Sequence, residues 1–178
     1  MRKIKLYIAV SLDGKIAKPD GDVSWLDELP KPDHSDYGYA DFLSSVDTTL
    51  MGNNTYKQLL GFGIDFPYYG KENYVFTRNT ELTEDENVKF ISQDPVSFVS
   101  DIKSSQGGDI WLIGGEEVNT LLLNGKLIDE LIIFVIPVVL GNGILLFGST
   151  PFETKLEMIK SNAYSNGVIE INYKINNA

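Results

Sequence analysis

The feature of this sequence that most constrains its fold is a strand-to-helix unit between residues 109 and 125. An apolar run from Asp109 to Ile113 ends at Gly114-Gly115, and the residues from Glu116 to Leu123 follow with helical spacing before Gly125. A strand that feeds a helix through a tight glycine turn is typical of α/β folds with a parallel sheet.

The rest of the pattern predicts a sheet around this unit, supported by a 43% apolar composition. Strands are indicated at 5–10, 48–51, 73–77, 88–91 and 127–139, and helices at 35–45, 54–60 and 95–104. Segments 155–163 and 168–175, joined through Ser165-Asn166-Gly167, indicate a hairpin. We therefore expect residues 1–178 to form a single three-layer α/β domain, with a mostly parallel sheet and an antiparallel C-terminal hairpin.

Charge and composition exclude several functions. Fifteen basic against 25 acidic residues give a net charge of −10, which disfavours nucleic acid as a partner. The chain has no cysteine and one histidine, His34, expected in a solvated loop, so we expect no disulfide, thiol nucleophile or histidine-rich metal site. No apolar run approaches about 18 residues, so we expect a cytoplasmic protein without a membrane span.

The glycine pair that ends the central strand is the strongest candidate for a ligand site. Glycine lets the backbone approach a ligand closely, and a helix N-terminus offers free N–H groups to phosphate. Glycines at this point equally suit a tight turn with no ligand. Glu116 and Glu117 complement the helix dipole but would compete with a bound anion. Both interpretations stay open on these residues alone.

Two other expected strand ends also carry polar residues. Gly52-Asn53-Asn54-Thr55 precedes a helix, and Thr77-Arg78 follows a strand. Thr55 suits a helix cap or a phosphate contact, and Arg78 suits a phosphate contact or an ordinary surface position. Because ligands of open α/β sheets bind at the carboxyl ends of the strands, these loops together favour a nucleotide site.

Four motifs, taken in order, are similar to those of the RibD C-terminal domain, the reductase domain of riboflavin-biosynthesis proteins. Two of them are shared with the broader dihydrofolate-reductase-like superfamily. The motifs are Ser11-Leu12-Asp13-Gly14-Lys15-Ile16-Ala17, then Met51-Gly52-x-x-Thr55-Tyr56, then Ile113-Gly114-Gly115, and finally Leu127 to Leu131 with Pro137 to Gly143 and Leu145 to Phe147.

The resemblance implies a dihydrofolate-reductase-like fold, NADPH as hydride donor and a pyrimidine- or pterin-type substrate. On this resemblance, the expected reaction is similar to that of 5-amino-6-(5-phosphoribosylamino)uracil reductase of riboflavin biosynthesis or of dihydrofolate reductase. It also implies a cofactor site, often with a cis peptide between the two glycines. Carried over by position, this site has Ile113, Gly114, Gly115, Glu116, Glu117 and Val118 at the pyrophosphate, Gly52, Asn53, Thr55, Thr77 and Arg78 beside the adenosine half, and Ala9, Gly14 and Ile16 near the nicotinamide.

The sequence departs from the family pattern in two ways. Asn53 stands where many relatives have an arginine that holds the 2′-phosphate, so a preference for NADPH over NADH would rest on Arg78. No deaminase domain with its zinc ligands is present, so the chain resembles a stand-alone reductase. A nucleotide-binding module without turnover, or an interaction protein without a pocket, are the alternatives.

Reduction of C=N or C=O also needs a proton, and the candidate acids are Asp36 and Asp13, with Asp33 and Asp41 as further carboxylates. Asp36 stands about where dihydrofolate reductases keep their substrate carboxylate, although it equally suits a helix N-cap. We expect desolvation to raise the pKa of the catalytic carboxyl. A homodimer is also expected, since Leu131 to Leu140 is apolar and the final hairpin offers a sheet edge.

Overall fold

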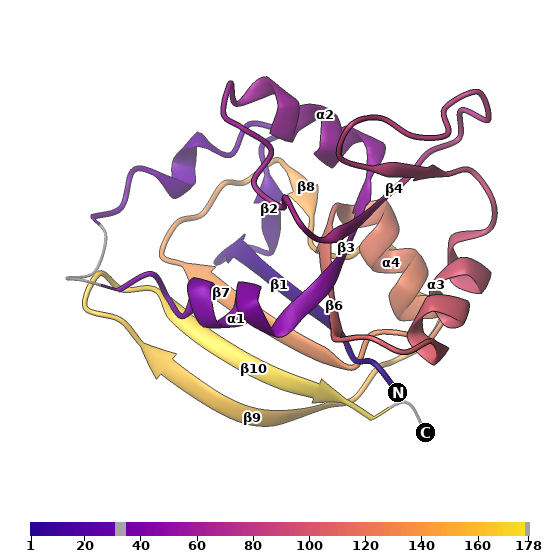
Figure 1. The fold of residues 1–178 in the computed structure, drawn as a ribbon. Helices are drawn as coiled ribbons and strands as arrows, with labels where there is room; N and C mark the ends of the chain where they lie inside the picture. The colour runs from indigo at the N-terminus through magenta and orange to yellow at the C-terminus, as the bar shows by residue number, and fades with distance from the viewer. Residues whose placement is uncertain (31–34, 177–178) are drawn as a thin grey trace.

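The computed structural model describes residues 1–30 and 35–176, arranged around one eight-stranded sheet (Figure 1). His34 and Asp33 lie outside the described residues. Four α-helices and a short 3-10 helix accompany the strands. In chain order the elements are β1 (Ile4–Ser11), β2 (Lys15–Ala17), η1 (Ser24–Leu26), α1 (Tyr39–Ser45), β3 (Val46–Gly52), α2 (Asn53–Gly61), β4 (Glu72–Phe76), β5 (Lys89–Ile91), α3 (Pro95–Ser104), β6 (Asp109–Gly114), α4 (Glu116–Asn124), β7 (Glu130–Ile136), β8 (Ile144–Leu145), β9 (Leu156–Ala163) and β10 (Ile169–Ile175).

The sheet has the order β5-β4-β3-β6-β1-β7-β10-β9. The strands from β5 to β7 in this order run parallel, whereas β10 is antiparallel to both β7 and β9. This confirms the expected architecture of a mostly parallel sheet that ends in an antiparallel hairpin. Because the parallel strands share one direction, the loops after β1, β3, β4, β6 and β7 leave from the same edge of the sheet.

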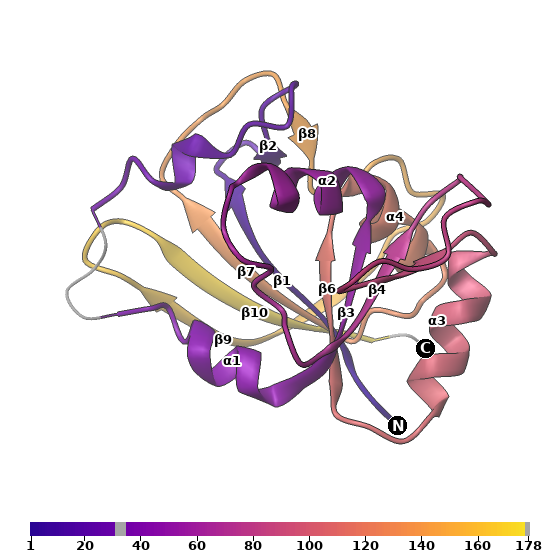
Figure 2. The same ribbon diagram turned by 45° about the horizontal axis from the view of Figure 1, so that its top comes forward.

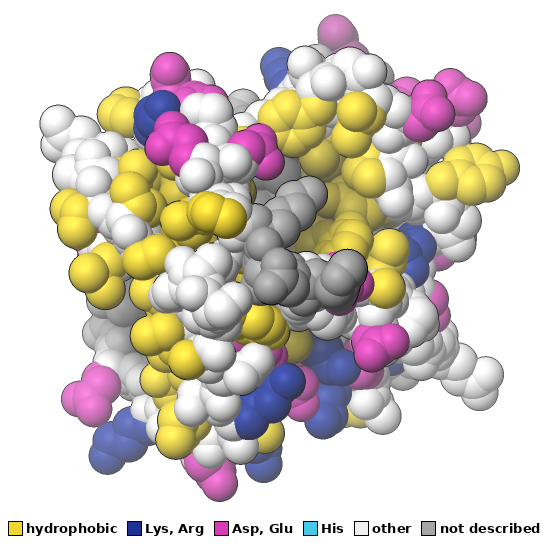
Figure 3. All heavy atoms as spheres, turned by 90° about the vertical axis from the view of Figure 1, so that its left-hand side faces the viewer, with side chains coloured by type: hydrophobic (Ala, Val, Ile, Leu, Met, Phe, Trp, Pro, Cys, Tyr) yellow, Lys and Arg dark blue, Asp and Glu magenta, His cyan; other side chains and the backbone are white. Residues whose placement is uncertain are grey.

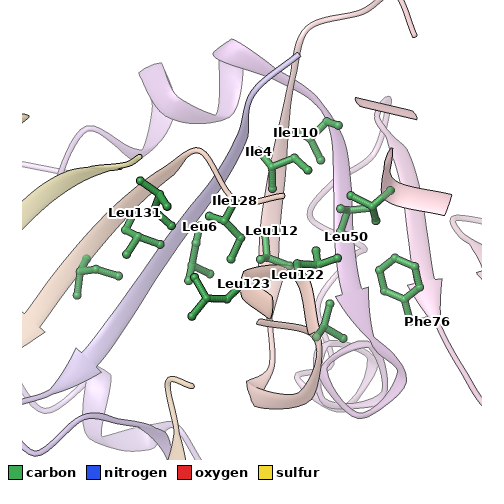
Figure 4. Close-up of a cluster of buried hydrophobic side chains, with 14 of the residues drawn as sticks. Ile4, Leu6, Leu50, Phe76, Ile110, Leu112, Leu122, Leu123, Ile128 and Leu131 are labelled. Carbon is green, nitrogen blue, oxygen red and sulfur yellow. The ribbon is translucent and has the colours of Figure 1, made fainter. Parts of the chain in front are cut away.

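Alternation along β1 divides the interior into two layers. Ile4, Leu6 and Val10 point to one face, where they pack with apolar side chains of α3 and α4 (Figure 4). Tyr7 points to the opposite face, where it packs with Phe42 of α1 and with Trp111 of β6. Helices therefore cover both faces of the sheet, as expected for three layers.

The strand region expected at 127–139 is shorter than the apolar pattern suggests. Strand β7 covers Glu130–Ile136, and the chain leaves the sheet at Pro137, which has no N–H to donate to a neighbouring strand. Strand β7 lies between β1 and β10, so it is an interior strand and offers no sheet edge to a second copy of the chain. Burial on both faces explains why its sequence is almost continuously apolar.

Helix α1 starts later than the sequence suggests. The expected start was Ser35 or Asp36, but the helix begins at Tyr39. Residues 35–38 form a turn in which Tyr37 and Gly38 both have positive φ angles, of 59° and 75°. A bulky residue rarely adopts this conformation, so the turn is held by its surroundings and not by local preference.

The structure contains a second, two-stranded sheet that the sequence analysis did not predict. Strand β2 pairs with β8 in antiparallel fashion, and this brings the loop after β1 against the glycine-rich loop after β7. The approach is so close that a Cβ atom on Gly143 would lie 2.4 Å from the Ala17 carbonyl oxygen. Only glycine fits there without a shift of the backbone.

Among the described residues, no helix has both the length and the apolar character needed to cross a bilayer.

Candidate functional site

The carboxyl ends of β3 and β6 meet at the edge of the sheet, where Figure 2 shows α2 lying across it. Met51 pairs with Gly114, and the next peptide, Gly114-Gly115, is cis, as the resemblance implied. A Cβ atom added to Gly115 would lie 3.5 Å from the Thr55 hydroxyl oxygen, and one added to Gly52 would lie 3.3 Å from a Val118 methyl group. The glycines therefore leave a narrow space between the starts of two helices.

Those two helices present unused backbone donors to this space. The N-cap residue of α2 is Gly52 and that of α4 is Gly115, and at neither helix start does an N-cap side chain accept a hydrogen bond from the first N–H groups. The first N–H groups of both helices are consequently available to an external acceptor. Together with the positive ends of the two helix dipoles, they suit a phosphate or pyrophosphate group.

The two acidic residues at the start of α4 each have a specific neighbour. Glu117 forms an ion pair with Arg78, with 2.9 Å between its Oε2 and the guanidinium Nη2. Glu116 lies against the loop after β8, where its Oε1 would be 2.8 Å from a Cβ atom on Gly148. The structure thus brings Arg78 to the rim of the glycine space but pairs it with a carboxylate.

Asn119 of α4 links this space to the turn after β1. Its Nδ2 donates to the Leu146 carbonyl at 3.0 Å, and the Leu146 N–H in turn donates to the Gly14 carbonyl at 3.0 Å. The side-chain oxygen of Asn119 is fully buried, has no hydrogen-bond partner among the described residues, and would lie 3.2 Å from a Cβ on Gly114. Sequence reasoning missed Asn119, because nothing in the sequence marks which residue of a helix faces the strand end.

Of the other residues expected at the cofactor, Ile16 packs with Val118 against the same core, whereas Ala9 faces the aromatic side of the sheet. Asn53 is the first residue of α2. Thr77 follows β4, where its hydroxyl accepts a hydrogen bond from the Asn79 N–H at 3.1 Å. The two ends of the expected cofactor site are the glycine space and the turn after β1, and they are connected through the Leu146 backbone just after β8. Thr77 lies with Arg78 beyond the end of β4.

Asp13 holds the glycine-rich loop in place. Its Oδ1 accepts hydrogen bonds from the Ser11 hydroxyl at 2.7 Å and the Leu140 N–H at 2.9 Å, and its Oδ2 accepts from the Gly141 N–H at 2.8 Å. The hydrogen bond from Ser11, followed by those from the two backbone N–H groups, lowers the pKa of Asp13 to about 2. This carboxylate is ionised at neutral pH and its lone pairs are engaged.

Asp36 lies beside a cavity of about 400 Å³ that it lines together with Tyr7, Ser35, Tyr37 and Tyr39. Its carboxylate accepts hydrogen bonds from the N–H groups of Ala40 and Gly38, both at 2.9 Å. These bonds lower the pKa of Asp36, so the rise expected from desolvation does not occur at this exposed carboxyl. Asp36 both caps the turn before α1 and faces the cavity, so the two interpretations of this residue are compatible. Asp41 lies in the first turn of α1.

The tip of the β9–β10 hairpin anchors the turn that carries Asp36. The Asn166 Nδ2 donates to the Tyr37 hydroxyl at 2.6 Å and to the Pro30 carbonyl at 2.9 Å. The Tyr37 ring packs edge-on against Tyr164, with 4.8 Å between the ring centroids. Figure 3 shows that hydrophobic side chains gather on this side of the molecule and that its surface is hollowed. These long-range contacts had no sequence signal.

Within residues 1–30 and 35–176, no group of three or more histidine, cysteine, aspartate or glutamate side chains is placed to hold a metal ion.

The fold is that of a dihydrofolate-reductase-like α/β protein. The sequence model of the RibD C-terminal domain matches residues 70–170, so the chain belongs to the RibD C-terminal domain family. Among curated proteins of Bacillus subtilis (strain 168), it is 46% identical to the uncharacterised protein YwjB, covering 88% of this chain and 89% of YwjB. It is 35% identical to the uncharacterised protein YyaP, with coverages of 98% and 96%.

Solved structures agree with this assignment. A putative riboflavin biosynthesis protein from Shewanella sp. PV-4 superposes with a TM-score of 0.87 at 30% identity, covering 98% of this chain and 99% of that one. A Thermotoga maritima deaminase/5-amino-6-(5-phosphoribosylamino)uracil reductase has a TM-score of 0.72 at 17% identity, and this chain spans 57% of its length. Dihydrofolate reductase from Enterococcus faecalis, complexed with NADP(H), has a TM-score of 0.70 at 16% identity, covering 98% of this chain and 96% of that one.

The contacts of Asp13 predict a pH-dependent contribution to stability. Its pKa is lower in the folded protein than the value of about 3.9 expected in the unfolded chain, so its contribution is present above that value and is lost as the pH falls towards about 2. Replacement by asparagine, which has one acceptor oxygen, leaves one of the Leu140 and Gly141 N–H groups unmatched. We expect Asp13→Asn to lower the Tm at pH 7 and the difference from wild type to shrink below about pH 3, as measured by calorimetry. An equal loss of Tm at both pH values would show that ionisation is not involved.

Proposed function

We propose that the protein is an NADPH-dependent reductase of a pyrimidine- or pterin-type ring, as in 5-amino-6-(5-phosphoribosylamino)uracil reductase or dihydrofolate reductase. The observation that carries the proposal is the glycine-lined space between two uncapped helix starts, at the same sheet edge as the loop after β1.

We also propose that residues 1–178 act as one domain, because both ends of the chain contribute strands to the same sheet.

The residues present suit a dinucleotide on chemical grounds. Gly114, Gly115, Glu116, Glu117 and Val118 would hold its pyrophosphate through backbone N–H groups, with Ile113 and Thr55 beside them. Gly52, Asn53, Thr77 and Arg78 would meet its adenosine half, and Ala9, Gly14 and Ile16 its nicotinamide. When bound, NADPH supplies a hydride, and the protein contributes position and the exclusion of water.

The cavity beside Asp36 suits a planar, polar ring. Its walls are the aromatic rings of Tyr7, Tyr37 and Tyr39, which offer flat surfaces, and one carboxylate lies at its rim. Because the pKa of Asp36 is lowered, we assign this residue to accept hydrogen bonds from ring N–H groups, and not to store the proton. Asp13 would act indirectly, by fixing the loops on either side of the nicotinamide.

A nucleotide-binding module without turnover is the second candidate. The lowered pKa values of Asp36 and Asp13 favour it, because both carboxylates are ionised at neutral pH and neither has a proton to donate. The Arg78–Glu117 ion pair bears instead on cofactor choice, since it would have to open or be shared before Arg78 could meet a phosphate. The two candidates separate in one experiment, in which NADPH binding is measured by Trp111 fluorescence and oxidation by the loss of nicotinamide absorbance with a panel of amino-uracils and pterins. Binding without oxidation across the panel favours the module, and absence of binding contradicts both candidates.

Gly115→Val tests the cofactor position. The φ angle of Gly115 is −74°, and a Cβ there would contact only the Thr55 hydroxyl at ordinary distance, so the fold should tolerate the change. The γ-methyl groups would nevertheless fill the space assigned to the pyrophosphate. We expect NADPH affinity to fall by at least about tenfold, with an unchanged circular dichroism spectrum. Gly61→Ala, in a glycine of α2 with open space around it, is the control. Wild-type NADPH affinity in a folded Gly115→Val protein would contradict the assignment.

Arg78 and Glu117 give a pair of opposite tests of cofactor preference. If Arg78 meets the 2′-phosphate, Arg78→Ala should weaken NADPH binding by about tenfold and leave NADH binding nearly unchanged. Glu117→Gln frees Arg78 from its partner and should strengthen NADPH binding relative to NADH. Titration calorimetry with both cofactors at fixed ionic strength measures these changes. Equal effects on the two cofactors would assign the ion pair to structure alone.

We further propose that the protein is a homodimer that pairs through β9. This strand is exposed along its whole length, contacts β10 on one side, and presents Leu156, Met158 and Ile159 to solvent at 44%, 62% and 56% exposure. An exposed edge strand presents unpaired N–H and C=O groups on which a second strand can pair. Light scattering should give twice the chain mass of 19.8 kDa, and Ile159→Lys should give the monomer mass, whereas Leu121→Lys, at an exposed position of α4, should not. A monomeric wild type at micromolar concentration would contradict the dimer.

A further inference from the structure

Tyr7 is the strongest candidate outside the residues already assigned. It lies on β1, two positions before Ala9 and on the same face of the sheet. Residues two apart in a strand are separated by about 6.6 Å, so the Tyr7 ring stands next to the residue assigned to the nicotinamide. The ring also forms part of the wall of the cavity that Asp36 lines.

The Tyr7 ring is held firmly while its hydroxyl is held weakly. The ring stacks on Phe42 with 4.3 Å between centroids, and it packs at an angle against Phe134 at 4.8 Å and edge-on against Trp111 at 6.1 Å. Among the residues that the structure describes, the hydroxyl has one long hydrogen bond, donated to the Tyr37 carbonyl at 3.4 Å. A ligand in the cavity could therefore take this donor at little cost.

The two candidate acids, Asp36 and Asp13, do not store a proton at neutral pH. The pKa values of Asp36 and Asp13 are both lowered by the hydrogen bonds that they accept. Glu170 on β10 is buried, but its two oxygens are taken by the Tyr164 hydroxyl at 3.0 Å and the Lys160 ammonium at 2.9 Å. Burial raises the pKa of Tyr7, and the nearby charges of Glu170, Tyr164, Asp36 and Tyr39 raise it further. The Tyr7 phenol is consequently protonated over the whole physiological range.

We propose that the Tyr7 hydroxyl donates the hydrogen bond, and then the proton, to the nitrogen or oxygen atom of the substrate's reducible C=N or C=O group. This inference rests on the proposed reductase function and assigns the substrate class more closely. The substrate is a planar heterocycle with an acceptor atom towards Tyr7 and N–H donors towards the carboxylate of Asp36.

The proposed step transfers one hydride and one proton to the double bond of the substrate. The hydride, which the proposed function takes from a dihydronicotinamide, adds to the carbon of the double bond, and the π electron pair moves to the nitrogen or oxygen. That atom takes the proton from the Tyr7 O–H group. The phenolate left behind is a strong base in this buried position, and it recovers a proton from solvent at the mouth of the cavity.

The test uses 6-aminouracil, a ring that carries both carbonyl acceptors and N–H donors, and reads binding without turnover. Trp111 lies edge-on to Tyr7, so its fluorescence reports occupation of the cavity. Tyr7→Phe keeps the ring contacts and removes only the hydroxyl, and we expect it to weaken 6-aminouracil binding about three- to tenfold. Asp36→Asn should weaken the same ligand independently, because it meets the other edge of the ring.

Tyr68→Phe is the matched control. Tyr68 also packs edge-on against Trp111, at 5.0 Å, yet it lies outside the lining of the cavity, so the same chemical change should leave ligand binding unaltered. NADPH affinity should be equal in Tyr7→Phe and wild type. With a substrate from the panel, turnover of Tyr7→Phe should fall by about 10²-fold or more.

Failure of this inference is distinguishable from failure of the proposed function. Equal 6-aminouracil binding by wild type and Tyr7→Phe, or no saturable binding by wild type at millimolar concentration, overturns the role of Tyr7 whatever the result with NADPH. Full turnover by Tyr7→Phe overturns proton donation. Absence of NADPH binding to wild type instead overturns the proposed reductase, while the difference in ring binding still reports on Tyr7.

Discussion

The parallel pairing of β1 with β6 on one side and β7 on the other is the constraint on which the rest of the structure depends. It brings the glycine pair after β6 and the loop after β7 to the same edge as the turn after β1. Alternation along β1 then sends Ile4 and Leu6 into the core with α3 and α4, and Tyr7 into the aromatic layer on the other face. The glycine-lined space and the cavity beside Asp36 are therefore two consequences of one strand and its pleat.

Hydrogen bonds from backbone N–H groups decide the electrostatics of the site. The carboxylates of Asp13 and Asp36 each accept two such bonds, so both serve as anchors for loops and both stay ionised at neutral pH. Two groups that keep a proton beside the cavity are the phenols of Tyr7 and Tyr39, whose pKa values rise on burial. A site with ionised carboxylates and protonated phenols would bind substrate N–H groups through the carboxylates, and a tyrosine would donate the proton.

The sequence predicted the parts of the fold whose signals are local. The strand, glycine pair and helix from Asp109 to Asn124 were correct because periodicity and capping act within a few residues, and the RibD-type motifs pointed to the right family. The pairing of β2 with β8 was missed, since strands of two or three residues have no period to detect. The contact between Asn166 and Tyr37 joins segments far apart in the sequence, and the pKa of Asp36 depends on a turn whose positive φ angles the residue types did not indicate.

The position of β1 in the sheet has a consequence for how the chain folds. The strand is synthesised long before either neighbour, since Ile4 pairs with Ile110 and Leu6 pairs with both Leu112 and Leu131. Parallel pairing over such separations has a large loop-closure cost and is a slow step in folding. The central core therefore cannot close while the ribosome is still adding β6 and β7, and the apolar face of β1 stays without its partner strands until about three quarters of the chain has been synthesised.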